Sequence, residues 1–296
     1  MRALASLALP LLAAATLPAC LLEGDGPDEP VPPDVTSGTY RHYAQSSWTL
    51  PATSEDARRY GFDFDGDRTI DNQAGAVIAA LDNIGLDVQT ASDTAITAGE
   101  LVILHSVRAD ELTDDGSVSW RVLSGRPTTP PRWDGTDDFI VAGEDGSFVG
   151  PIVRQNARLD WGVINVTLPF FPDQAPTILP LADARIDARI TDDGCEGTIG
   201  GVMLAADIDV TLRRFAAQAI THIERHPEHE LARVAYQVFD TNRDGVITVA
   251  EMVSNSITQS LFSPDLDLDG RAGNDALSFG LGFSCEAARF SAPGEI

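Results

Sequence analysis

The stretch from Asp240 to Glu251, DTNRDGVITVAE, constrains this chain more than any other. Gly245 at its sixth position permits a left-handed backbone turn, and Ile247 at its eighth suits a core. Apolar residues recur at helical spacing on both sides, which predicts a tight loop between two helices. Side chains with oxygen atoms stand at positions 1, 3, 5 and 12, namely Asp240, Asn242, Asp244 and Glu251.

This loop resembles the calcium loop of the EF-hand family, and the resemblance covers residues 227–262. The resemblance implies a calcium ion held by side-chain oxygens, by one backbone carbonyl and by both oxygens of the final glutamate. The implied ligands are Asp240, Asn242, Asp244, Val246, Thr248 and Glu251. The alternative is a degenerate loop with a structural role alone.

Two further loops are rich in aspartate, and the first of them resembles the DxDxD calcium loops of dockerin-like or thrombospondin-like proteins. Aspartates at every second position gather around one point when the chain curls, which suits a hard cation. Counted from the first aspartate, position 12 is Ala74 in one loop and Ala276 in the other, not glutamate. A solvated acidic turn is therefore the alternative for both. The candidate ligands are Asp63, Asp65, Asp67 and Asp71, and then Asp265, Asp267 and Asp269.

The charge of the chain excludes several functions. A formal net charge of -25 argues against nucleic acid as a partner, because a phosphate polymer would be repelled. The chain has no lysine, which excludes Schiff-base chemistry and a Walker lysine. With 45 acids, pairs of carboxylates carry no information about a glycosidase. No motif indicates catalysis, and His222, His226 and His229 offer only a weak alternative as zinc ligands.

The N-terminal residues are typical of an exported chain. Residues 1–20 read as a signal peptide that ends in a lipobox-like Leu17-Pro18-Ala19-Cys20, with Cys20 as the lipidation site. A simple cleavable signal is the alternative. Residues 21–39 are rich in Gly, Pro, Asp and Glu and predict a flexible acidic linker. We therefore expect an outer-membrane or cell-surface lipoprotein held by a lipid anchor, or otherwise a periplasmic or secreted protein.

Two cysteines follow Cys20, and their number fits a disulfide. In an oxidising compartment Cys195 and Cys285 are expected to pair, with two free buried thiols as the alternative. The bond would tie the last strand of the chain to its middle.

The middle of the chain predicts short strands separated by turn residues. Apolar and charged residues alternate cleanly over 184–190, as in a half-buried strand. Six or more such segments predict a β-sandwich or jelly-roll-like body. The expected class is α+β, with this body followed by a C-terminal helical EF-hand segment. The expected parts are 40–95 with an Asp-rich loop, the body 96–209, the helical segment 210–262, and 263–296 with a strand that returns to the body.

The order of these parts resembles a group of uncharacterised bacterial lipoproteins, which implies no activity. The expected function is calcium binding by an exported envelope protein, with calcium mainly structural. One alternative is a calcium-dependent adhesion or carbohydrate-binding module with a glycan or protein ligand. A second is a secreted hydrolase with an unrecognised acidic site.

Overall fold

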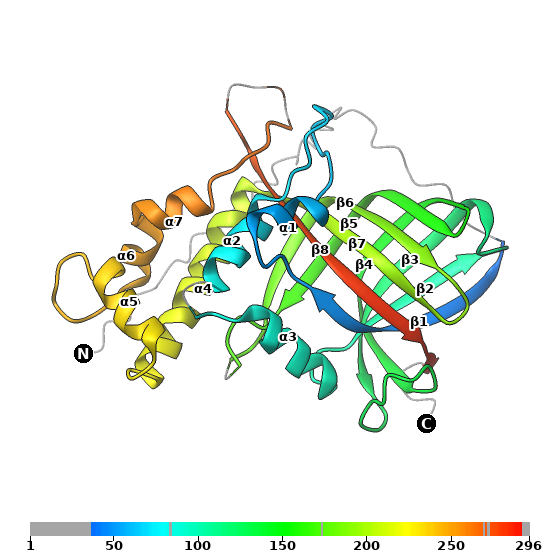
Figure 1. The fold of residues 1–296 in the computed structure, drawn as a ribbon, viewed down its shortest axis with the longest axis horizontal. Helices are drawn as coiled ribbons and strands as arrows, with labels where there is room; N and C mark the ends of the chain where they lie inside the picture. The colour runs from blue at the N-terminus through cyan, green and yellow to red at the C-terminus, as the bar shows by residue number, and fades with distance from the viewer. Residues whose placement is uncertain (1–36, 83–84, 173, 269, 271–272, 292–296) are drawn as a thin grey trace, which may run out of the picture. The chain divides into compact units, whose positions relative to one another are not determined.

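The computed structural model describes residues 37–82, 85–172, 174–268, 270 and 273–291 (Figure 1). The expected signal peptide with Cys20, most of the linker, and Asp269 lie outside the described residues. None of the helices in the described ranges is long and apolar enough to cross a membrane.

Eight antiparallel strands form a closed barrel, because β3 pairs with β2 on one side and with β4 on the other. A short ninth strand, β9 (Arg289–Ser291), runs parallel to the start of β4. The barrel strands are β1 (Thr39–Thr49), β2 (Ile103–Ala109), β3 (Asp114–Pro127), β4 (Asp138–Val153), β5 (Asn156–Leu168), β6 (Thr177–Ile190), β7 (Gly194–Leu204) and β8 (Ala276–Ala287).

The expected sandwich is wrong, and bulges explain why. The Asp145-Gly146 pair predicts a turn between two short strands, but both segments belong to the 16-residue β4. The pairing of β4 with β5 shifts register between Ser147 and Val149, and the pairing with β3 shifts three times. Bulges let long, tilted strands bend around a closed barrel. Turn-forming residues inside strands therefore made long strands look short, which is the pattern of a sandwich.

The barrel closes through strands from the two ends of the described chain. Strand β8 lies between β1 and β7, and Figure 1 shows β8 beside β1. Its Gly280 is required by a close approach, because a Cβ there would collide with the carbonyl oxygen of Tyr60. The expected return of this strand to the β-rich body is thus a barrel closure.

The expected disulfide between Cys195 and Cys285 is confirmed. The two residues are directly paired across β7 and β8, with their Cα atoms 5.0 Å apart. The bond therefore joins neighbouring barrel strands that are separated in the chain by four helices.

The expected C-terminal helical EF-hand segment is also wrong as a description of the fold, because these helices are an insertion between β7 and β8. They lie together beside one end of the barrel in Figure 1. The second of the two helices expected around the loop, within 227–262, is interrupted at Asn255, whose side chain accepts the N–H of Ile257 and starts a new helix. The inserted helices are α4 (Ala205–Arg225), α5 (Glu230–Phe239), α6 (Val249–Ser254) and α7 (Ser256–Leu261).

Three helices connect β1 to β2: α1 (Ser54–Arg59), α2 (Gln73–Asp82) and α3 (Val88–Thr97). Helix α2 buries Val77 and Ile78, and α3 buries Val88 and Ile96. The interior of the barrel contains large, fully buried side chains such as Trp120, and these join the residues under the helices in one continuous core. The first Asp-rich loop lies between α1 and α2, and its buried Phe64 packs in a separate small cluster with Leu266.

Candidate metal centre

The first Asp-rich loop is a closed turn held by its own carboxylates. Phe62 and Asp71 form a β-bridge at its base. Between them, Asp63 accepts the backbone N–H groups of Gly66 and Arg68, at 2.8 and 3.0 Å. Gly66 has a φ of +80° and Arg68 one of +74°, so the chain turns back on itself twice. Each carboxylate is thus fixed by the loop that it organises.

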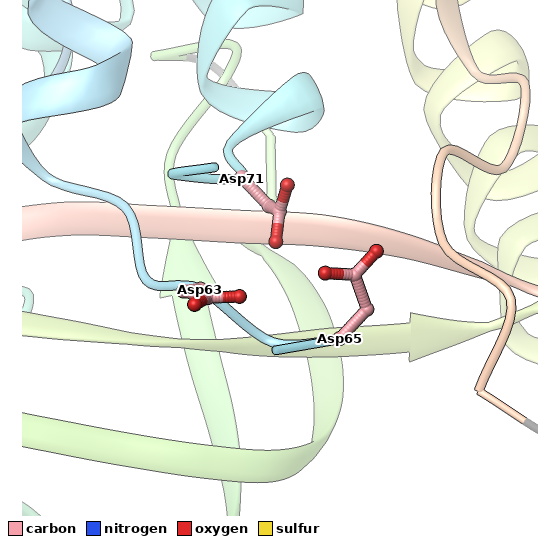
Figure 2. A group of neighbouring side chains, drawn as sticks. All are labelled: Asp63, Asp65 and Asp71. Carbon is pink, nitrogen blue, oxygen red and sulfur yellow. The ribbon is translucent and has the colours of Figure 1, made fainter. Parts of the chain in front are cut away.

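Three of the four aspartates in this loop converge. One carboxylate oxygen from each of Asp63, Asp65 and Asp71 lies within 4.8 Å of the others, and Figure 2 shows the three side chains pointing toward one another. Among the described residues this is the one group of three or more acidic, histidine or cysteine side chains with that spacing. Asp67 stays outside the group, and the N–H of Thr69 holds its carboxylate at 2.5 Å.

The environment of Asp71 disfavours a negative charge. Partial burial raises the pKa of this carboxyl to about 6, and the charges of Asp65, Asp265 and Asp67 add to the effect. The N–H of Phe64, which donates to the carboxylate at 3.0 Å, acts in the opposite direction. Without a cation the three carboxylates repel one another, so a positive ion among them would stabilise the negative charge on Asp71.

Two residues outside the loop hold it against the barrel. The Arg185 guanidinium of β6 donates to the backbone oxygen of Asp63 at 2.7 Å and lies over the ring of Phe64. Asn72 is buried next to Asp71 and pairs with the backbone of Gly280, donating to its oxygen and accepting its N–H. Its side-chain oxygen also accepts the N–H of Gly75 in the first turn of α2. The loop therefore joins α2 to strands β6 and β8.

The third Asp-rich loop repeats the first. Phe62–Asp71 reads FDFDGDRTID and 266–275 reads LDLDGRAGND, so Asp63 corresponds to Asp267. Asp267 accepts the N–H of Gly270 at 2.9 Å, as Asp63 does from Gly66. The third Asp-rich loop is also closed at its base, by a β-bridge between Leu266 and Ala276. The two loops thus share a sequence pattern and a way of turning.

This correspondence changes which residues are candidates in the third loop. Asp275 accepts the N–H of Leu268 at 3.0 Å, so it corresponds to Asp71. Asp265 instead accepts the N–H and the hydroxyl of Ser278 in β8, so its carboxylate is already bound. Sequence reasoning missed Asp275 because it counted the loop from Asp265. A direct alignment of the two loops was the signal that could have found it.

The two similar loops lie side by side on the barrel. Phe64 and Leu266 belong to one small buried cluster with Val202 and Ala276. Asp265 is close enough to Asp71 to raise its pKa. A single hydroxyl, that of Ser278, connects them further, because it accepts the N–H of Gln73 and donates to Asp265. A cation in the first Asp-rich loop would therefore also affect the third Asp-rich loop through these contacts.

The loop from Asp240 to Glu251 curls around its first residue. Asp240 accepts the N–H groups of Asp244 and Gly245, at 3.1 and 3.0 Å. Gly245 has a φ of +83°, as the sequence predicts, and Ile247 is buried in the core while Val246 is exposed. Arg243 is also left-handed, with a φ of +61°.

Glu251 turns back toward the start of α6. Its carboxylate accepts the N–H of Thr248 at 3.0 Å, while the Thr248 hydroxyl accepts the N–H of Glu251, which makes a capping box. The N–H of Thr248 is the main cause that holds the pKa of Glu251 below its usual range. Its other oxygen accepts from the Thr241 hydroxyl at 3.2 Å. Asp240, Asp244 and Glu251 are not among the converging groups of the described residues.

The three candidate histidines lie where α4 ends and α5 begins. The rings of His222 and His226 lie 4.7 Å apart, and that of His229 lies 6.1 Å from His222. His229 uses its Nδ1 to accept the N–H of Leu231, which caps the start of α5.

Comparison with protein-family models found no match, and comparisons with curated proteins and with solved structures found none either. The function of these loops therefore has to be derived from their geometry and chemistry.

Proposed function

We propose that this protein binds calcium, and that the ion acts mainly as a structural clamp at the barrel. The observation that carries the proposal is the convergence of Asp63, Asp65 and Asp71 within 4.8 Å. Oxygen ligands from a curled aspartate-rich loop are what a hard divalent cation requires. The raised pKa of Asp71 supports the same reading, because the site without an ion disfavours the charge that the ion would stabilise.

A structural role follows from what surrounds the loop. Asp71 is adjacent to Asn72, which binds both backbone groups of Gly280 in β8. Asp63 is tied through its backbone to Arg185 in β6. An ion among the carboxylates would therefore fix the loop between α2 and two barrel strands. Because the ion binds the folded chain only, it would raise stability by mass action.

The loop from Asp240 to Glu251 is proposed as a further calcium site. The ligand types at positions 1, 3, 5 and 12 and the turn at Gly245 support it. The ion would have to compete with Thr248 for the Glu251 carboxylate. We therefore expect this site to be weaker than a loop whose last carboxylate already points inward.

The disulfide between Cys195 and Cys285 supports a place in an oxidising compartment. Extracellular calcium modules bind with dissociation constants of about 10⁻⁴ to 10⁻³ M. Sites of that strength suit a clamp that stays filled outside the cell, and a signalling switch would need tighter binding.

Calorimetric titration and thermal unfolding with calcium, magnesium and a chelator test the proposal. Asp65→Asn should lower calcium affinity by roughly tenfold and reduce the rise in melting temperature. Glu251→Gln should remove only the weaker binding step. Glu111→Gln is the matched control, because Glu111 is an exposed acid outside all three loops. Identical melting curves in calcium and in chelator would exclude the proposal.

A further inference from the structure

An apolar cavity lies among the inserted helices. Its volume is about 200 Å³, and it is bounded by α4, α5, α6 and α7, with Leu81 of α2, Leu86, and Phe171 from the loop after β5. Thr258 is the one polar residue among those that line it. A smaller space of about 40 Å³ shares the Phe215 and Phe262 walls and reaches Phe279 of the barrel. The helices therefore enclose room that their own side chains do not fill.

This volume is large for a protein interior. Cores are packed as densely as organic crystals, and voids larger than a water molecule are few. An apolar cavity of about 150 Å³ stays dry and accepts benzene, whereas pockets for drug-sized ligands begin near 300 Å³. The cavity lies between these limits, so it fits one ring or a short alkyl chain and excludes a peptide.

The lining decides the chemistry of the occupant. The four aromatic walls are Phe171, Phe215, Phe239 and Phe262, and Met252 adds a thioether. Aromatic edges and a polarisable sulfur favour contact with another aromatic ring. A charged group would find no ion-pair partner in this wall and would lose its hydration without compensation. Ile257, which is 52% exposed, also lines the cavity and marks where it approaches the surface.

We propose that this cavity is a binding site for a small uncharged apolar molecule, with a single aromatic ring as the best fit. No carboxylate lines the site, although Phe239 and Met252 in its wall adjoin Asp240 and Glu251 in the sequence. An apolar molecule in the cavity makes dispersion contacts with lining side chains that otherwise face empty space.

Titration with toluene, followed by ¹H–¹³C methyl spectra and by thermal unfolding, tests this proposal. The expected result is a saturable shift of methyl signals from Leu212, Val234 and Met252, together with a rise in melting temperature. Ala219→Leu places added carbons into the cavity from α4, where Ala219 is buried and lines it. This variant should melt at a higher temperature and bind toluene at least about tenfold more weakly.

A second variant covers the case in which Ala219→Leu does not fold. Phe262→Ala enlarges the cavity, so it should bind the two-ring naphthalene more tightly than the wild type does. Toluene that leaves methyl signals and melting temperature unchanged at saturation in the wild type would overturn the proposal. An equal response of the wild type and the folded Ala219→Leu variant would also overturn it.

Discussion

Asp71 and Asp275 hold equivalent places in two copies of one loop. Each carboxylate accepts the backbone N–H of the residue seven positions earlier, Phe64 in one case and Leu268 in the other, at 3.0 Å in both. Their neighbouring apolar residues pack in one buried cluster. The barrel therefore carries a pair of matching loops side by side, and a mutation can be made at the same place in each.

Asp275→Asn and Asp265→Asn should separate the binding role from the structural role in the third loop. We extend the calcium proposal to the third loop, so Asp275→Asn should reduce the number of calcium ions bound and leave the metal-free melting temperature nearly unchanged. Asp265→Asn should lower the metal-free melting temperature, because the carboxylate of Asp265 accepts two hydrogen bonds from Ser278. Calcium titration and thermal unfolding of both variants check this, and the opposite pattern would assign the binding role to Asp265.

Calcium binding should weaken in acid through Asp71. Burial raises the pKa of this carboxyl to about 6, so the proton and the ion compete for it at mildly acidic pH. From this group alone, affinity should fall by about fivefold between pH 6 and pH 5, because the ionised fraction falls from about one half to about one eleventh. Calorimetry between pH 5 and 7.5 measures the effect. Asp71→Asn should bind calcium weakly and with little dependence on pH over this range.

The same variant should be more stable than the wild type when no metal is present. The pKa of Asp71 is raised in the folded state from its usual 3.8 to about 6. Its contribution to stability is therefore full below pH 3.8 and lost as the pH rises through 6. Asp71→Asn removes this loss, so its metal-free melting temperature at pH 7 should exceed that of the wild type. A lower value would contradict the assigned cause of the pKa shift.

The local sequence was a better guide to single elements than to closure of the barrel. The alternating residues over 184–190 lie in strand β6, as predicted, and the Cys195–Cys285 bond follows from the cysteine count. Gly194–Leu204 was not predicted as a strand because it contains four glycines, although it is the barrel strand β7. The barrel also needs β1 to pair with β8, strands from opposite ends of the described chain, and no local pattern encodes so distant a partner.

For the candidate sites, too, the local sequence indicates single residues better than it indicates which residues come together. The sequence pattern ranks the loop from Asp240 to Glu251 first, because its ligand spacing matches a known loop. The structure brings carboxylates together instead at Asp63, Asp65 and Asp71. Convergence depends on the bridge between Phe62 and Asp71 and on support from Arg185, which is distant in sequence. Spacing along the chain does not carry that information.

Asn72→Ala should be strongly destabilising with or without calcium. The side chain is buried and makes four hydrogen bonds, to Ala57, Gly75 and both backbone groups of Gly280. Alanine would leave these backbone groups unpaired in the core, at a cost of about 2–4 kcal/mol. Urea unfolding measures it. Asn165→Ala, on the exposed face of β5, is the control and should change stability little.

Replacing both cysteines by serine should lower stability without opening the barrel. Cys195 and Cys285 are paired within the eleven registered residue pairs of β7 and β8, so the strands retain their backbone hydrogen bonds. Loss of the bond raises the conformational entropy of the unfolded chain, which should lower the free energy of unfolding by about 2–4 kcal/mol. Urea unfolding of the Cys195→Ser/Cys285→Ser variant measures this, and reducing the wild type should have the same effect. An unchanged urea midpoint after reduction would count against a structural role.

Acid should weaken the barrel through His105, which is buried inside it. Its Nδ1 accepts the indole N–H of Trp120 at 3.0 Å, so its Nε2 donates to Gln45. Burial lowers the pKa of His105 to about 3 from the usual 6.5. The unfolded chain therefore binds a proton first, and the stability contributed by neutral His105 is lost as the pH falls from 6.5 toward 3.

The effect of Asp71 on stability has the opposite dependence on pH, so the measurement belongs in the metal-free Asp71→Asn background. In that background, the urea concentration at the unfolding midpoint should be lower at pH 5 than at pH 7. His105→Gln should lose stability at pH 7 and show a smaller further loss at pH 5, whereas equal acid sensitivity of the two proteins would exclude His105 as the source.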